Sequence, residues 1–512
     1  MQDVSACKAN DTDEEMLPDV ESLSQTQSKW GDFRWACKKF LAFFGPGYMI
    51  AVGYMDPGNW ATDLEGGSRF GYSLLFVILL SNIMAVVLQG LAIKLGVVTR
   101  CDLAQACRKY YPPWVNIGLY VICELAIVAC DLAEVIGSAV ALNMLFGIAL
   151  PAGVLITTLD VLLILFTYRN DSIKSVRLFE IFVVLLVLAV GGCFMLELVF
   201  VKPNLEQIML GFIPSKIIFT NPDALYISIG IVGATVMPHN LYLHSHVVKV
   251  RSPKSQTDQV HLLDTHSNGV TWINQIRNSI RFSILDCVVA LTFAVFINAA
   301  ILIVSAGAFY YGPFPHTVVA DLFDAHQLLT KYLGPGAGFI FAFALLLSGQ
   351  SSTITATLAG QIVMEGFLGL SIRPWLRRLI TRSLAIIPAM IVALVKGADG
   401  LNGLLIASQV ALSIQLPFAV IPLVMFTNNE KIMTLQVENY ENSQDHPPTA
   451  SYGAISQNPT DEPNNDDSAQ SISTVDFSNP WWLKIIACTV ATVILGLNMY
   501  LLIETLRGEV IV

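Results

Sequence analysis

Apolar runs of about 20 residues recur along the whole chain, and this repetition limits the possible folds more than any other feature. A helix of that length is what a chain needs to cross the hydrocarbon core of a bilayer. Only 13% of the 512 residues are charged, which is about half the fraction typical of soluble domains. The sequence therefore predicts an all-α polytopic membrane protein with about eleven transmembrane helices, at roughly 41–66, 73–96, 114–146, 150–167, 178–200, 222–248, 279–309, 335–366, 376–396, 401–427 and 480–503.

The positions of the basic residues predict how these helices are oriented. Lys and Arg collect in the cytosolic loops of membrane proteins. If the N-terminus is cytosolic and the spans alternate in direction, 23 of the 29 Lys and Arg residues fall on the cytosolic side. We therefore expect a cytosolic N-terminus and an outer C-terminus. The plasma membrane and an endosomal or vacuolar membrane are both compatible with this pattern.

Two polar segments divide the chain into four regions. Residues 1–40 and 428–479 are rich in Asp, Asn, Ser, Gln and Pro, a composition typical of disordered segments. Neither segment is basic, so nucleic-acid binding has no support, and neither indicates an obligate protein partner. We predict a cytosolic disordered tail over 1–40, a ten-helix core over 41–427, a cytosolic disordered acidic linker over 428–479, and an eleventh helix with a short outer tail over 480–512.

Two of the predicted helices are interrupted near their middle. The first contains "VGYMDPGN" at 52–59, and the sixth contains "VGATVMPHN" at 232–240. Proline removes an intrahelical hydrogen bond, and irregular backbone survives at membrane depth only where it lines a protein cavity. The two helices begin five spans apart, so the halves that they open are inserted in opposite senses. Interrupted helices at matching positions of inverted halves point to the substrate site of a transporter.

The residues at these interruptions predict the kind of substrate. Asp56 offers a carboxylate and Asn59 an amide oxygen. The second interruption adds the Met237 thioether and the carbonyl of Ala234, which the proline frees. A thioether favours transition metals, whereas Mg²⁺ and Ca²⁺ prefer sites made of oxygen alone. The pattern therefore favours a divalent transition-metal ion as the substrate.

Three stretches together resemble the natural-resistance-associated macrophage protein (Nramp) family of proton-coupled divalent-metal transporters. They are "DPGN", "MPHNLYLHS" and "GQSSTITATLAGQIVMEGF", the last running into "RRLITRSLAIIP". The resemblance covers nearly everything from about residue 40 to 427, looks most like the fungal members, and implies two inverted five-helix repeats similar to the sodium-coupled amino-acid transporter fold. Because the family also has magnesium-transporting and signalling relatives, the retained Met237 argues against magnesium here. By matching motif positions, the resemblance assigns metal ligation to Asp56, Asn59, the Ala234 carbonyl and Met237, joined in some conformations by Gln409.

The third predicted helix carries three carboxylates within "CELAIVACDLAEVIG". Glu124, Asp131 and Glu134 share one face of a helix at about 100° per residue. Charged side chains at membrane depth face the protein interior and find partners. We expect Arg382, at the entry of the ninth helix, to be the counter-charge of this face.

Histidines on the sixth helix suggest where protons travel. His239 and His244 can change their charge near physiological pH, and His239 lies two residues from Met237. A row of acids and a histidine beside a metal site favours a proton route toward the cytosol, although a static buried salt-bridge network would use the same residues. The resemblance supports a proton role for Asp56, Glu134, Asp131, His239 and Arg382. Gln89 and Asn298 are candidates for contacts around the ligands.

These observations favour a proton-coupled secondary transporter of Mn²⁺ and Fe²⁺ into the cytosol. One alternative is a metal sensor or receptor on a transporter scaffold, which would require a large folded cytosolic domain. Another is an amino-acid transporter of the same fold, although Asp56 would repel a substrate carboxylate. No nucleotide-binding glycine motif accompanies the spans, so we predict neither an enzyme nor a cofactor, and the metal ion and protons are substrates.

Overall fold

A computed structural model of the chain describes residues 47, 50–51, 53–157, 191–192, 194–196, 198–199, 201, 203–251, 269–311, 321–370, 374–438 and 472–507. The predicted tail over 1–40 lies outside these residues. The two predicted runs at 150–167 and 178–200 lie largely outside them.

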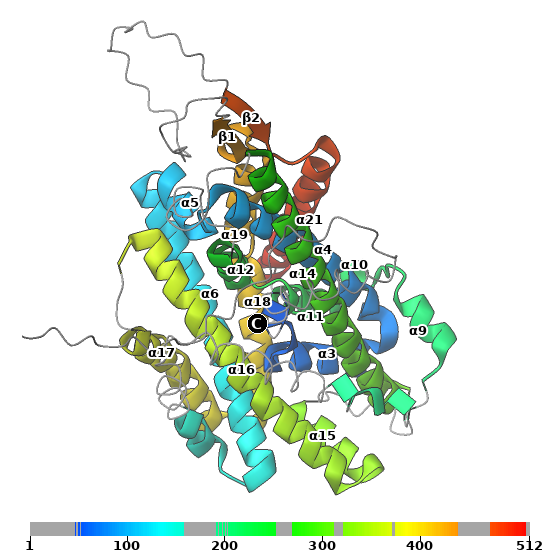
Figure 1. The fold of residues 1–512 in the computed structure, drawn as a ribbon. Coiled ribbons are helices and arrows are strands. Elements are labelled where there is room, and N and C mark those ends of the chain that lie inside the picture. The colour runs from blue at the N-terminus through cyan, green and yellow to red at the C-terminus, as the bar shows by residue number, and fades with distance from the viewer. Residues whose placement is uncertain are drawn as a thin grey trace, which may run out of the picture. The chain divides into compact units, whose positions relative to one another are not determined.

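The described part of the chain is almost entirely helical (Figure 1). Up to residue 251 its elements are the 3-10 helix η2 (Gly53–Met55), α3 (Pro57–Phe70), η3 (Gly71–Leu74), α4 (Leu75–Thr99), α5 (Leu103–Tyr110), α6 (Pro113–Phe146), α9 (Leu205–Gly211), α10 (Ile217–Thr220), α11 (Pro222–Thr235) and α12 (Pro238–Arg251). Then come α14 (Gly269–Ser305), the π-helix η4 (Ala306–Tyr310), α15 (Leu322–Leu333), α16 (Pro335–Leu368), α17 (Pro374–Val395), α18 (Gly397–Gln415), α19 (Pro417–Asn428), α20 (Glu430–Met433), β1 (Thr434–Glu438), β2 (Ile472–Asp476) and α21 (Trp481–Leu506).

Seven helical segments of the described residues are long and apolar enough to cross a membrane. They are Gly53–Thr99, Pro113–Phe146, Pro222–Val250, Trp272–Tyr310, Pro335–Leu368, Gly400–Asn428 and Trp481–Leu506, and a shorter apolar helix covers Leu379–Val395. Each overlaps at least one predicted run. The all-α polytopic architecture is therefore confirmed, while the total of eleven helices stays a prediction.

Both predicted interruptions are present. The first helix breaks between η2 and α3, where Asp56 caps the new helix and Pro57 occupies its first turn. Proline suits that position because its missing N–H would have no intrahelical partner there. The sixth helix breaks between Thr235, which ends α11, and Pro238, which begins α12. The run predicted at 401–427 is also divided, since α18 ends at Gln415 and α19 begins after Leu416.

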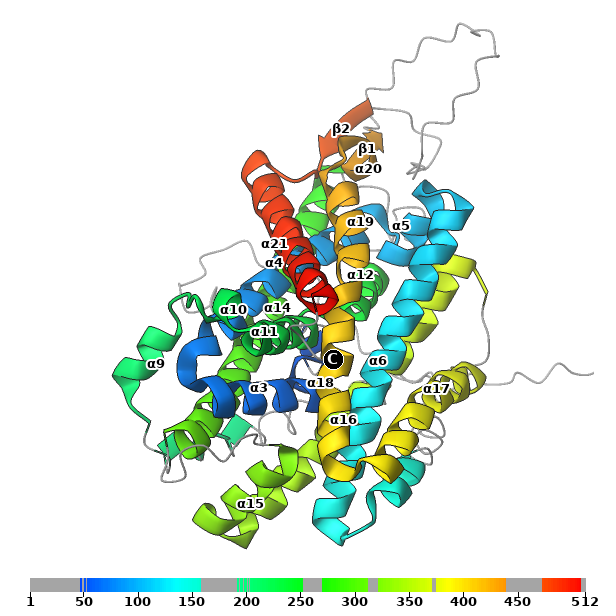
Figure 2. The same cartoon turned by 180° about the vertical axis from the view of Figure 1, so that it is seen from behind.

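The broken helices lie at the centre of the packing. In Figures 1 and 2, α3, α11, α12 and α18 meet in the middle of the drawn helices. α11 packs on α18 and α3, and α12 packs on α4. α6 runs beside α16 and also contacts α18 and α17, while α21 lies against α19 (Figure 2). The interruptions are thus enclosed by other helices, as irregular backbone at membrane depth requires.

The ends of the predicted linker carry regular structure, which differs from the expectation of disorder over 428–479. Strands β1 and β2 pair antiparallel, with Thr434 opposite Asp476 and Glu438 opposite Ile472. The Lys94 ammonium on α4 donates to the Ser478 carbonyl at 3.0 Å. Composition alone misled the prediction, because pairing and this anchor satisfy backbone groups of a polar segment. Residues 439–471 lie outside the described part.

Candidate functional site

The break in the first helix places a buried carboxylate at the start of α3. Asp56 is fully buried, and its Oδ1 accepts the Asn59 backbone N–H at 2.8 Å. This is the N-cap geometry that aspartate favours. The same Oδ1 accepts the Asn59 side-chain Nδ2 at 2.7 Å. Oδ2 of Asp56 is buried and accepts no hydrogen bond from the described residues.

The break in the sixth helix meets the first break through Asn59. Nδ2 of Asn59 also donates to the Ala234 carbonyl, at 3.1 Å, across 175 positions of sequence. Met237 is fully buried one residue before α12 and belongs to a small apolar cluster with Ala126, Cys130, Ala356 and Leu412. Hydrogen bonds of Asn59 therefore join three of the four residues expected at the interruptions.

Gln409 reaches the same place from α18. Its side chain is fully buried and lies so close to Gly58 that a Cβ there would sit 2.0 Å from Nε2 of Gln409. A Cβ on Gly233 of α11 would sit 2.0 Å from the Gln409 carbonyl. These two glycines let α3 and α11 approach α18 closely. Oε1 of Gln409 is buried and has no hydrogen-bond partner among the described residues.

The two residues expected around the ligands do contact this region. Asn298 on α14 donates from Nδ2 to the Tyr54 carbonyl at 3.1 Å and to Oδ1 of Asn59 at 3.5 Å. Gln89 on α4 donates to the Tyr54 hydroxyl at 2.8 Å and contacts Nδ1 of His244 at 2.8 Å. The Tyr54 hydroxyl, Gln89 and His244 thus form a buried chain from the first broken helix to the second.

The carboxylates on α6 have separate basic partners. Glu134 is fully buried, and its Oε2 accepts from the Thr353 hydroxyl at 2.7 Å and from Arg382 at 3.4 Å. Glu124 instead forms an ion pair with Arg377 at 2.6 Å. The expectation that Arg382 balances the whole face is therefore wrong for Glu124, because α17 presents a second arginine about one and a half turns earlier.

Asp131 and His239 lie near each other inside the protein. Both are buried, and they are close enough for the Asp131 carboxylate to act electrostatically on the His239 ring. Nδ1 of His239 has no hydrogen-bond partner among the described residues. The fold therefore brings Asp131 of α6 near the α12 histidine that lies two residues after Met237.

Sequence reasoning missed three residues of this region. Tyr54 carries no charge and lies within an apolar run. Thr353 is part of the quoted "SSTIT" stretch, but nothing in that pattern indicates its contact with Glu134. Arg377 lies five residues before Arg382, so the two arginines are about one and a half helical turns apart, and this spacing is the signal in the sequence for a second basic partner.

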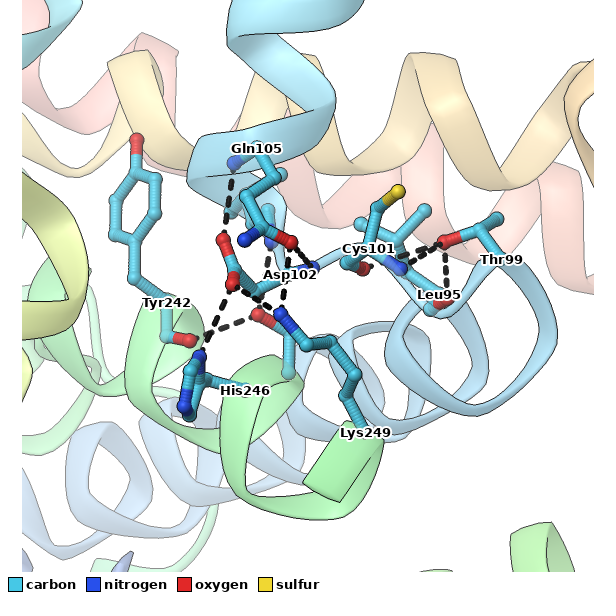
Figure 3. A network of polar contacts seen from close by, with 10 residues as sticks. Leu95, Thr99, Cys101, Asp102, Gln105, Tyr242, His246 and Lys249 are labelled. Carbon is cyan, nitrogen blue, oxygen red and sulfur yellow. Dashed lines mark hydrogen bonds and ion pairs between the residues drawn. The ribbon is translucent and has the colours of Figure 1, made fainter. Parts of the chain in front are cut away.

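A second polar network links α5 to the far end of α12 (Figure 3). Oδ2 of Asp102 accepts from Nδ1 of His246 and Nζ of Lys249, both at 3.0 Å, and Lys249 also donates to Gln105 at 2.8 Å. Burial tends to raise the pKa of Asp102, but the hydrogen bond from His246 and the charge of Lys249 outweigh it and hold that pKa below its ordinary value. This network fixes α12 beyond the candidate metal ligands.

The candidate metal ligands are not a conventional cluster of ionisable side chains. Among the described residues, no group of three or more His, Cys, Asp and Glu is placed to hold a metal ion. The arrangement instead offers one carboxylate, amide and backbone oxygens, and a thioether. Such a mixed set suits a softer divalent ion better than Ca²⁺ or Mg²⁺.

Comparisons with known proteins show which family the chain resembles. Residues 47–442 match the family model described as natural resistance-associated macrophage protein-like. A divalent metal cation transporter MntH from Nostoc sp. is 49% identical over 472 residues, covering 92% of each chain. The MntH of Bradyrhizobium diazoefficiens is 52% identical over 398 residues, covering 77% of this chain and 83% of that one. These relatives are bacterial and give no support to the expected likeness to fungal members.

Solved structures show the same fold. The crystal structure of the Eremococcus coleocola manganese transporter in complex with an aromatic bis-isothiourea substituted compound superposes with a TM-score of 0.71. It is 32% identical, and the match covers 95% of this chain and 90% of that one. A structure of MhsT in complex with L-phenylalanine, 15% identical with a TM-score of 0.50, shares the fold alone. From its matched residues, its relatives and its fold, the chain belongs to the natural resistance-associated macrophage protein (Nramp) family.

Proposed function

We propose that this protein is a secondary transporter that carries divalent transition-metal ions, Mn²⁺ and Fe²⁺, into the cytosol together with protons. The observation that carries the proposal is the buried group of acceptor atoms where the two broken helices meet. Asn59 is hydrogen-bonded there to both Asp56 and the Ala234 carbonyl, and Gln409 approaches from α18.

The Asn59 side chain marks the place of the cation. Its Nδ2 group lies between Oδ1 of Asp56 and the Ala234 carbonyl, so a partly positive group already joins these two oxygens. A metal ion favours the same surroundings. If the Asn59 amide turns over, its oxygen replaces the Nδ2 group and becomes a third oxygen ligand. The buried acceptors Oδ2 of Asp56 and Oε1 of Gln409 are available without breaking a hydrogen bond to the described residues.

Met237 supports the choice of a transition metal. It is fully buried beside the second break, where a purely structural role would be served equally by leucine. Thioether sulfur is a soft ligand, whereas Ca²⁺ and Mg²⁺ favour oxygen ligands alone. The names of the relatives agree, since two are called divalent metal cation transporters and one is called a manganese transporter.

The proton route is supported by the packing of α6 against α12, α16 and α17. His239 lies next to the metal ligands in sequence and near Asp131 in space. Glu134 lies further along the same helix as Asp131, hydrogen-bonded to Thr353 and Arg382. Carboxylates and histidines buried in a membrane protein serve as proton relays. The ion pair of Glu124 with Arg377 continues this row of charged groups along α6.

A transporter and not an enzyme is the class that the family and the names of the relatives support. We propose no cofactor, and the partners are the metal ion, protons and the surrounding lipid. The amino-acid alternative is disfavoured, because the buried carboxylate of Asp56 at the break would repel a substrate carboxylate.

The test is Mn²⁺ uptake by the purified protein in proteoliposomes, with pH and voltage set independently. We expect uptake to increase with outside acidity and each transport cycle to acidify the lumen. Protein-free vesicles and vesicles given Mg²⁺ are the controls. Metal uptake without any proton movement would refute the proposed proton coupling. Absence of Mn²⁺ uptake by correctly inserted protein would refute the proposed transport function.

A further inference from the structure

Asp286 is a buried acid on α14 that the proposed metal and proton sites do not use. Its side chain is 1% exposed. Oδ2 accepts the backbone N–H of Gly47 at 2.7 Å, across 239 positions of sequence. Gly47 lies directly against α14, since a Cβ there would sit 2.8 Å from both the Asp286 backbone carbon and its carboxylate oxygen. A hydrogen bond and a close backbone approach therefore join these residues.

The bond gives a buried backbone donor a partner on another helix. Backbone N–H groups inside a membrane must be satisfied by protein, because water is absent there. Gly47 is helical and buried, and it precedes the first interruption. Nearer the break, Asn298 of the same α14 donates to the Tyr54 carbonyl at 3.1 Å. Helix α14 thus holds the backbone before the break at two points, Gly47 and Tyr54.

The position of this backbone determines where the site residues that follow Gly47 lie. Tyr54 carries the hydroxyl that reaches Gln89, and Asp56 caps α3 two residues later. We propose that Asp286 is a positioning residue, which fixes the backbone at Gly47 against α14 and so places Tyr54 and Asp56. Gly47 is needed for the same placement, because a Cβ there would collide with Asp286.

The proposal is tested first without metal, by hydrogen exchange of peptides that cover residues 47–55. Asp286→Ala leaves the buried Gly47 N–H without its acceptor, and exchange of these amides should become about 10- to 100-fold faster. Asp286→Asn keeps an acceptor oxygen and should stay within about threefold of the parent. Gly47→Ala should resemble Asp286→Ala, although alanine is intrinsically the better helix former.

The matched control is Asn498→Ala on α21. Asn498 is also buried and donates to backbone carbonyls, those of Ser413 and Ile494, both at 2.9 Å. It should leave exchange over 47–55 unchanged. Equal exchange over 47–55 in the parent and Gly47→Ala would overturn the proposal, and so would an equal rise in Asn498→Ala. The Gly47→Ala result decides the question even if Asp286→Ala fails to fold.

A second readout rests on the proposed transport function. Asp286→Asn should retain Mn²⁺ binding within about threefold and keep most of the uptake rate, whereas Gly47→Ala should bind Mn²⁺ about tenfold more weakly because it displaces Asp56. A general structural role predicts instead that Asn498→Ala weakens Mn²⁺ binding as much. If the parent itself carries no Mn²⁺, the proposed function fails while the exchange result still judges the positioning role.

Discussion

Replacing Asp56 separates its role as a helix cap from its role as the anion of the metal site. Oδ1 accepts two hydrogen bonds from Asn59 at 2.7 and 2.8 Å. Asparagine is about as good an N-cap as aspartate, whereas alanine costs about 1 kcal/mol. Asp56→Asn should therefore unfold at nearly the parent temperature in detergent, and Asp56→Ala should unfold at a lower one.

Metal binding should fall in both variants, because both lose the only carboxylate among the proposed ligands. Removing one member of a buried charge pair costs about 3–5 kcal/mol. At about 1.4 kcal/mol per tenfold, the Mn²⁺ dissociation constant should rise by about two to three and a half orders of magnitude. Isothermal titration calorimetry with Mn²⁺ measures this directly, and uptake into proteoliposomes should be lost in parallel. Mn²⁺ binding by Asp56→Asn within about threefold of the parent would refute the assignment.

Three further predictions concern selectivity, coupling and acid stability. Met237→Ala should keep Mn²⁺ uptake within about threefold but let Ca²⁺ compete; unchanged rejection of Ca²⁺, measured by competition, would place selectivity elsewhere. Glu134→Gln should still bind Mn²⁺ but lose the stimulation of uptake by external acid, and undiminished proton flux per metal in the same vesicles would contradict the proton route. The folded-state pKa of Asp102 lies below its ordinary value, so this carboxylate stabilises the protein above the unfolded pKa of about 4, and that contribution is lost as pH falls through the folded pKa. Asp102→Asn should lower the unfolding temperature at pH 7 and flatten its decline below about pH 4, and an unchanged temperature at pH 7 would show that the network in Figure 3 contributes no stability.

The local sequence around the two interruptions determined much of the candidate site. Pro57 and Pro238 interrupt a helix whatever their tertiary contacts, because proline lacks the backbone N–H and clashes with the preceding turn. Asp56 caps the start of α3 for an equally local reason. The matching positions of the two breaks were therefore readable without a structure, and so was the set of residues beside them. Their roles in metal binding remain predictions.

Other features depended on the tertiary structure, because their partners lie far apart in sequence. The orientation of the Asn59 amide is set by Ala234 across 175 positions, and the contact of Gly47 with Asp286 spans 239. The partner of Glu124 is Arg377 and not the expected Arg382. Helix periodicity predicts which face of a helix a residue lies on, but not which residue of a neighbouring helix lies level with it. Periodicity and proline chemistry act within a few turns, so the local sequence determines where a helix breaks and which polar groups the break leaves without intrahelical partners. The distant groups that bond to these polar groups are decided only when the helices pack.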